Sequence, residues 1–307
     1  MNIPFLFAAL LVVANQGGGS ISFVDRSSMN VVKTIEAGLG PHEAAASPDG
    51  KRAAITLYGR QLPSHELLIV DPRQQTIVKR IDLSPSERAH GVTWRRGGIY
   101  ITLEKENAVA RVDPDKGAVT WRASTKGELG HMLAVSGNER KVYTGNMKTN
   151  DVSVIRVGEA EAYKTIPVGA GPEGLALSPD DRELWVAHRK GGGISIIDTT
   201  TDTVVATIAP ELYSARVTFT PDGKKVLLYD MPTRSVVVFD RATRKEIGRA
   251  VPREGVPVGG VVVDAKRAYI LRYQPDAVVE LDLEQMQFGR AVETAPMPDG
   301  IAPVTIP

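Results

Sequence analysis

One position of a repeated sequence motif carries histidine three times in succession. We call it the variable position. The motif copies are GPHEAA, RAHGVT, LGHMLA, GPEGLA, YSARVT, PVGGVV and MPDGIA. In this order, the residues at the variable position are His42, His90, His131, Glu173, Ala215, Gly259 and Asp299. Neutral imidazoles bind divalent transition metals such as Zn²⁺, Mn²⁺, Fe²⁺, Cu²⁺ or Ni²⁺. The sequence therefore predicts a metal site with the ligands His42, His90, His131 and Glu173.

Three histidines with open coordination positions are typical of catalytic metal sites rather than structural ones. Such a metal could polarise a substrate carbonyl or activate water, with Glu173 or Asp299 as general base. The histidines could instead line a polar, water-filled channel mouth without any metal. As a third alternative, they could bond carbonyls of neighbouring loops.

A second set of polar residues ends the strand that follows each motif. The seven equivalents are Asn15, Leu57, Leu103, Asn146, His188, Asp230 and Arg272. We expect His188 to assist Glu173 in catalysis, and Asn15, Asn146 and Arg272 to bind substrate. The alternative for the Asn and Asp residues is turn formation, which both side chains favour.

Three further residues are candidates for substrate binding. Tyr58 and Arg60 belong to the segment YGRQLPSHE, which also carries His65 and is longer than its counterparts. Arg216 directly follows the variable position and could hold a carboxylate. The alternatives are a solvated insertion for the segment, and a position between blades for Arg216.

The motif recurs seven times, at intervals of about 40 to 49 residues, which is the period of propeller blades. Each copy precedes short segments rich in Val, Ile and Thr with period-2 alternation and Asp-containing turns, as in ELWVAH, ISIIDTTTD and TVVATI. These features predict four antiparallel strands per repeat. Because the innermost strand of each blade lines a central channel, the variable position should lie at one channel mouth.

The two ends of the chain supply parts of one repeat. LVVANQGGGSISFVDRSSMNVVKTI from Leu11 aligns with WVAHRKGGGISIIDTTTDTVVATI from Trp185, pairing Val13 with Val186 and Asp25 with Asp198. We therefore expect residues 10–37 and 296–307 to form one closing blade within a single domain, 1–307. The apolar residues 1–9 are interpreted as the remnant of an export signal or as an apolar cap.

Composition excludes several classes of function. The 307 residues include 37 Lys and Arg against 36 Asp and Glu, so no basic face for nucleic acid is expected. No cysteine is present, which excludes thiolate metal sites and cysteine nucleophiles. No apolar run reaches the length of a membrane span.

The segment GPEGLALSPDDRELWVAHRKGGGISIIDTTTDTVVATI resembles the YVTN family of β-propeller repeats. This resemblance implies an all-β, seven-bladed propeller and a periplasmic or secreted location. Similar propellers include lactonases, amine dehydrogenase heavy subunits, haem d1 proteins and surface-layer proteins. We expect a metal-dependent lyase or hydrolase, similar to lactonases, acting on a small carbonyl- or carboxylate-bearing substrate. One alternative is a non-catalytic scaffold, which would bind a ligand or a protein partner on the same face. The other alternative is a haem d1 protein.

Overall fold

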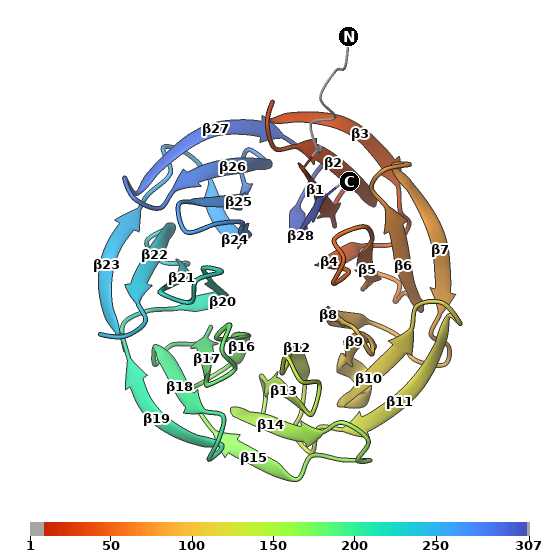
Figure 1. Ribbon diagram of the computed structural model, residues 1–307, viewed down its shortest axis with the longest axis vertical. Helices are drawn as coiled ribbons and strands as arrows, with labels where there is room; N and C mark the ends of the chain where they lie inside the picture. Colours follow the sequence, from red (N-terminus) through yellow and green to blue (C-terminus); the bar gives the residue numbers. More distant parts are fainter. Residues whose placement is uncertain (1–8, 306–307) are drawn as a thin grey trace.

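The computed structural model describes residues 9–305 as a ring of seven four-stranded antiparallel sheets (Figure 1). This confirms the all-β, seven-bladed propeller predicted from the repeat. The innermost strands of the seven blades are β4 (Pro41–Ala46), β8 (Ala89–Arg95), β12 (Gly130–Val135), β16 (Pro172–Leu177), β20 (Ser214–Phe219), β24 (Val256–Val262) and β28 (Pro298–Thr305).

The other three strands of each blade follow outward in sequence order. The second strands are β5 (Ala53–Leu57), β9 (Gly98–Leu103), β13 (Lys141–Asn146), β17 (Glu183–His188), β21 (Lys225–Asp230), β25 (Arg267–Tyr273) and β1 (Ala9–Asn15). The third strands are β6 (Glu66–Asp71), β10 (Ala108–Asp113), β14 (Asp151–Arg156), β18 (Ile194–Asp198), β22 (Ser235–Asp240), β26 (Ala277–Asp282) and β2 (Ser20–Asp25). The outermost strands are β7 (Thr76–Asp82), β11 (Ala118–Ser124), β15 (Lys164–Pro167), β19 (Thr203–Ile208), β23 (Lys245–Ala250), β27 (Gln287–Glu293) and β3 (Asn30–Glu36).

The chain ends close the ring, as the sequence predicted. In the closing blade, β1 pairs with β28 on one side and with β2 on the other. The blade begins one residue earlier than expected, because Ala9 already pairs with Thr305. Residues 1–8, which make up the rest of the segment interpreted as an export signal, lie outside the described residues.

Burial follows the order of the strands within a blade. The second and third strands are buried on both faces, because the neighbouring blades cover them; the successive residues Val12 and Val13, which point to opposite faces of β1, have no exposed surface. The outermost strands are mostly exposed. At the hairpin leading to each outermost strand, an Asp usually accepts backbone N–H bonds, as Asp71 does from Arg73 and Gln74. This turn explains the Asp that ends the third strand in most repeats.

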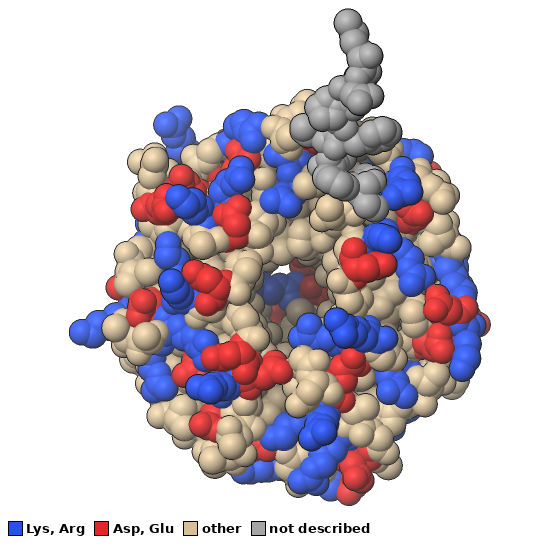
Figure 2. Space-filling model, in the orientation of Figure 1, with Lys and Arg blue, Asp and Glu red and all other residues tan. Residues whose placement is uncertain are grey.

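The charged side chains are mixed in sign over the visible face of the ring, and some of them lie deep in its central hollow (Figure 2). Among the described residues, no helix has the length and hydropathy to cross a membrane.

Candidate functional site

A β-bulge places the variable position in the channel. In the blades that carry the histidines, the pairing of the two inner strands shifts register at this point, between Pro41 and Ala44, Ala89 and Val92, and Gly130 and Leu133. A bulge interrupts the alternation of side chains along a strand and changes the direction in which they point. The variable position and the residue after it, such as His42 and Glu43, can therefore both contribute to the channel lining.

Buried threonines of the second strands hold these bulges and connect successive blades. The Thr56 hydroxyl accepts the Glu43 N–H at 3.1 Å and donates to the His90 carbonyl at 2.8 Å. The Thr102 hydroxyl accepts the Gly91 N–H at 2.8 Å and donates to the His131 carbonyl at 2.6 Å. Each threonine thus satisfies backbone groups that the bulge leaves without ladder partners.

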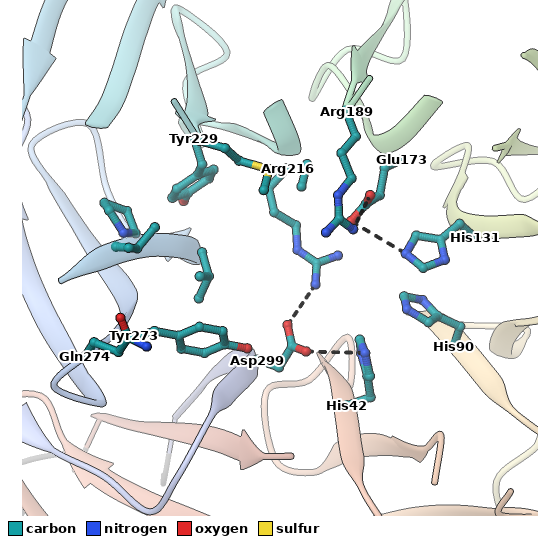
Figure 3. Close-up of a pocket in the computed structure, with 15 residues that line it drawn as sticks. His42, His90, His131, Glu173, Arg189, Arg216, Tyr229, Tyr273, Gln274 and Asp299 are labelled. Carbon is teal, nitrogen blue, oxygen red and sulfur yellow. Dashed lines mark hydrogen bonds and ion pairs between the residues drawn. The ribbon is translucent and has the colours of Figure 1, made fainter. Parts of the chain in front are cut away.

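The three histidines of adjacent blades form a stack (Figure 3). The ring centroids of His42 and His90 are 4.3 Å apart, and those of His90 and His131 are 3.6 Å apart. The ring of Tyr58 lies 5.3 Å from both His42 and His90. The structure therefore brings together all three predicted histidines and one predicted substrate-binding residue.

The pKa values of His90 and His131 are shifted in opposite directions. Burial, followed by the charges of His131 and His42, lowers the pKa of His90 well below its usual range. Burial also acts to lower the pKa of His131, but Glu104 and Glu173 outweigh it and raise this pKa to about 9. His131 Nδ1 lies 2.7 Å from Glu104, and its Nε2 lies 3.7 Å from Glu173. His131 is thus paired with carboxylates on both ring nitrogens.

One group of residues has the geometry of a metal site. His42, Glu43 and His90 each offer one donor atom, and these atoms lie within 4.8 Å of one another. Within the described part of the chain, the buried Nδ1 of His90 makes no hydrogen bond, and the buried Nδ1 of His42 makes only a 3.4 Å contact with Glu43 Oε1. The cluster contains two of the four predicted ligands, together with Glu43, which the sequence reasoning missed. His131 and Glu173 lie next to it but outside it.

Arg216 extends across the channel and binds residues of other blades. Its Nη2 lies 2.5 Å from Glu43 Oε1 and 3.1 Å from Asp299 Oδ1, while Nη1 contacts the sulfur of Met132 at 3.1 Å. Burial acts to raise the pKa of Glu43, but Arg216 outweighs this effect and the pKa falls to about 2. Arg216 therefore faces the channel rather than the space between blades.

A cavity of about 410 Å³ opens between these groups. It is lined by His42, His90, His131, Glu173, Arg189, Ala215, Arg216, Tyr229, Met231, Val256, Pro257, Val258, Tyr273, Gln274 and Asp299. Asp299 reaches His42 Nε2 at 3.3 Å, and Arg189 binds Glu173 at 2.8 Å. Of the predicted site residues, the cavity thus contains the three histidines, Glu173, Asp299 and Arg216.

Several predicted residues serve turns instead of the cavity. The Asn15 side-chain amide donates to Ser20 and Ser22, and that of Asn146 donates to Asp151 and Ser153. For both residues the structure therefore shows the local bonds expected of turn formation.

His188 and Arg272 also bond to nearby loops. His188 Nε2 accepts the Gly169 N–H at 3.2 Å, its Nδ1 faces the Gly192 carbonyl at 3.1 Å, and burial lowers its pKa. Arg272 donates to the Pro275 carbonyl at 3.0 Å and pairs with Glu254. Neither lines the cavity, because these bonds hold each side chain against its neighbouring loop.

The long segment after β5 was expected either to bind substrate or to be a solvated insertion, and its residues differ in this respect. Arg60 is exposed and His65 bonds the Ser86 carbonyl at 2.9 Å, as a solvated insertion would. Tyr58 instead packs against the histidines and donates to Glu104 at 2.5 Å. Burial, followed by Glu104, raises the pKa of Tyr58 to about 12.

The sequence reasoning missed Glu43, Glu104, Arg189, Tyr273 and Gln274. Glu43 had a detectable signal, because it follows the variable position as Arg216 does. Glu104, Arg189 and Tyr273 had one as well, because they directly follow Leu103, His188 and Arg272 and so share one repeat position with Tyr58. Glu104 begins a short 3₁₀ turn, Glu104–Glu106, directly after β9. Gln274, in the loop after β25, is the residue that this pattern does not mark.

The sequence pattern of the family described as YNCE-like beta-propeller matches residues 8–266. Antigen Lp49 of Leptospira interrogans is 27% identical over 248 residues, covering 76% of this chain and 45% of that protein. The 6-phosphogluconolactonase of Enterobacter sp. (strain 638) is 27% identical over 134 residues, covering 41% of this chain and 40% of the enzyme. The matches therefore span less than half the length of these two relatives.

A solved structure, the hydrazine synthase of Kuenenia stuttgartiensis, superposes with a TM-score of 0.74 at 18% identity. The match covers 87% of this chain and 91% of that one. At this identity the likeness concerns the fold alone. The family match extends over most of the repeat, and the chain belongs to the YNCE-like β-propeller family.

Proposed function

We propose that this propeller binds a divalent transition-metal ion through His42, Glu43 and His90. The observation that carries the proposal is the buried Nδ1 of His90, which has no hydrogen-bond partner among the described residues, beside His42 and Glu43 in the same cluster. His42 Nδ1 makes no well-directed hydrogen bond and lies 3.4 Å from Glu43 Oε1. A buried polar atom left without a partner costs about 1 to 3 kcal/mol, and a bound ion would remove this cost at His90. The donor types suit Zn²⁺, Mn²⁺, Fe²⁺, Cu²⁺ and Ni²⁺.

Carboxylates also surround the cluster. Glu43 belongs to it, Asp299 lies 3.3 Å from His42 Nε2, and Glu104 and Glu173 pair with His131. Arg189 and Arg216 pair with these carboxylates, and Arg88 lies 5.0 Å from the centre of the Tyr58 ring. The electrostatic support for a cation therefore comes from the Glu43 carboxylate within the cluster.

The enzymatic part of the proposal is a lyase or hydrolase reaction on a small carbonyl- or carboxylate-bearing substrate. A bound metal supplies Lewis-acid chemistry to such a substrate. Asp299 and Glu173 line the same cavity and are the candidates for holding or moving a proton. Arg216 and Arg189 would orient a substrate carboxylate. The similarity to a 6-phosphogluconolactonase supports this reaction class.

A non-catalytic scaffold that binds a ligand or a protein is the second candidate. The observation favouring it is that Glu43 already pairs with Arg216 at 2.5 Å, so one metal donor is shared with a structural ion pair. Metal binding without turnover of any substrate would favour the scaffold.

The first experiment is elemental analysis of the purified protein beside two variants. We expect about one equivalent of a transition metal in the wild type, and its loss in a folded His42→Ala/His90→Ala variant. His65→Ala is the matched control, because His65 bonds a loop carbonyl away from the cavity and should leave the metal content unchanged. Absence of metal from the wild type, even after reconstitution with each of the five ions, would overturn the proposal.

We also propose a periplasmic or secreted location. The absence of cysteine and the similarity to a protein named as an antigen support it. Cell fractionation in the native host tests it, and recovery of the protein solely in the cytoplasmic fraction would contradict it.

A further inference from the structure

We propose that the substrate of this cavity carries an apolar body, an aromatic ring or a short alkyl chain, next to its carboxylate or lactone group. A polyhydroxylated sugar acid is then a poor ligand. This inference rests on the proposed function for the polar end of the substrate. It extends that function by naming the chemistry of the other end.

The cavity has two chemically different sides (Figure 3). The histidines, Glu173, Arg189 and Asp299 occupy one side, on blades whose innermost strands are β4, β8, β12, β16 and β28. The opposite side belongs to β20 and β24 and their blades. Its apolar part consists of Ala215, Met231, Val256, Pro257 and Val258, with the rings of Tyr229 and Tyr273 beside them, and its polar groups are Arg216, Gln274 and the two tyrosine hydroxyls. Ligand sites that combine an apolar wall with a few polar groups bind molecules having both parts.

The apolar side continues to the rim of the cavity. Met231 is 41% exposed and Tyr213 is 40% exposed, and the Met231 N–H donates to the Tyr213 carbonyl. Large apolar side chains left in solvent beside a cavity are favourable contacts for a ligand that covers them. The thioether of Met231 offers no strong hydrogen bond to a ligand covered with hydroxyl groups.

The charged groups of the polar side already pair with one another, and the N–H donors that remain on the two arginines are those proposed for the substrate carboxylate. Arg189 is paired with Glu173, and Arg216 with Glu43 and Asp299. A buried hydroxyl without a partner weakens binding, because it loses its hydrogen bonds to water. Several hydroxyls of a polyol would lie against the valines of β24 without a hydrogen-bond partner.

The cavity volume suits this substrate class. A cavity of about 150 Å³ holds a benzene molecule, and this one measures about 410 Å³. An aromatic ring and a carboxylate on a short linker therefore fit beside a metal ion. A protein segment does not fit within this volume.

Calorimetric titration with two monocarboxylates, 3-phenylpropionate and gluconate, tests the inference. We expect the Zn²⁺-loaded protein to bind 3-phenylpropionate at least about tenfold more tightly than gluconate. The isosteric variant Val256→Thr/Val258→Thr should lower the affinity for 3-phenylpropionate about tenfold and leave the affinity for gluconate unchanged. Val261→Thr, on the same strand but outside the cavity lining, is the matched control.

Equal or tighter binding of gluconate, binding of neither acid, or an unchanged affinity in the double variant would overturn the inference. The same titrations on metal-free protein separate it from the proposed function. If Zn²⁺ does not bind but the preference for 3-phenylpropionate persists, the metal proposal fails and the apolar subsite stands. If Zn²⁺ binds and no preference appears, the subsite fails alone.

Discussion

Replacing Thr56 by valine tests how the bulges build the site. Thr56 is fully buried, and its hydroxyl connects two of the proposed metal ligands through their backbones, Glu43 by its N–H and His90 by its carbonyl. Valine has the same shape but can make neither bond. Both backbone groups would then be left in the interior without this partner.

The expected cost follows from these two bonds. Each buried group left unpaired costs about 1 to 3 kcal/mol, and the added methyl group recovers about 1 kcal/mol. The two groups together cost about 2 to 6 kcal/mol, so the free energy of unfolding should fall by about 1 to 5 kcal/mol. Because the same bonds fix the spacing of Glu43 and His90, Zn²⁺ affinity should also fall by about tenfold.

Thr102→Val is the matched control for this substitution. Thr102 is equally buried and makes the same two kinds of bond, to the His131 carbonyl and to the Gly91 N–H, which belongs to the same peptide group as the His90 carbonyl. It makes no bond to Glu43. Urea unfolding should show a similar loss of stability in both variants. Calorimetric Zn²⁺ titration should show the larger loss of affinity in Thr56→Val, because only this substitution also releases Glu43. Equal Zn²⁺ affinities in the two variants, or a stability loss below about 0.5 kcal/mol, would refute the reasoning.

Two further predictions concern the packing between blades. Gly174→Ala should lower the free energy of unfolding by about 2 kcal/mol, because the added Cβ would lie 2.5 Å from the Ala215 carbonyl oxygen. In Gly289→Ala the nearest atom would be 3.7 Å from the added Cβ, so the free energy of unfolding should change little. Urea titration of both variants measures the difference. Tyr143 donates to the buried Asp202 at 3.0 Å, and burial, followed by the charge of Asp202, raises the pKa of Tyr143. A raised folded-state pKa means that this stabilisation is complete below about pH 10, the tyrosine value in unfolded chains, and is lost as the pH rises above it. The melting temperature of Tyr143→Phe should therefore decline less steeply than that of the wild type above pH 10, and parallel curves would contradict this cause.

Side-chain bonding in the loops could not be predicted from the repeat. His42 and His188 both stand at strand ends on the same face of the ring, yet only His42 lines the cavity. His42 lies in the bulge of an innermost strand, whereas His188 ends a second strand and bonds the loop at Gly169. Sequence position gives the face of the ring but not the distance from its axis.

The residues after the variable position show the same limit. Period-2 alternation would send Glu43 and Arg216 away from the channel, and the bulge reverses this. Their ion pair joins residues 173 positions apart in the chain. No local pattern contains such a contact, because it depends on closure of the ring.

The sequence by itself determined the seven blades, the closing blade made from both chain ends, and the alignment of His42, His90 and His131 at one channel mouth. These follow from a repeat period and from alternation, which are local properties of the chain. Only the tertiary structure decided that His131 pairs with Glu104 and Glu173 while Glu43 lies with His42 and His90 in the cluster proposed to bind a metal ion. Those assignments depend on distances across a closed ring, where side chains from different blades compete for the same partners.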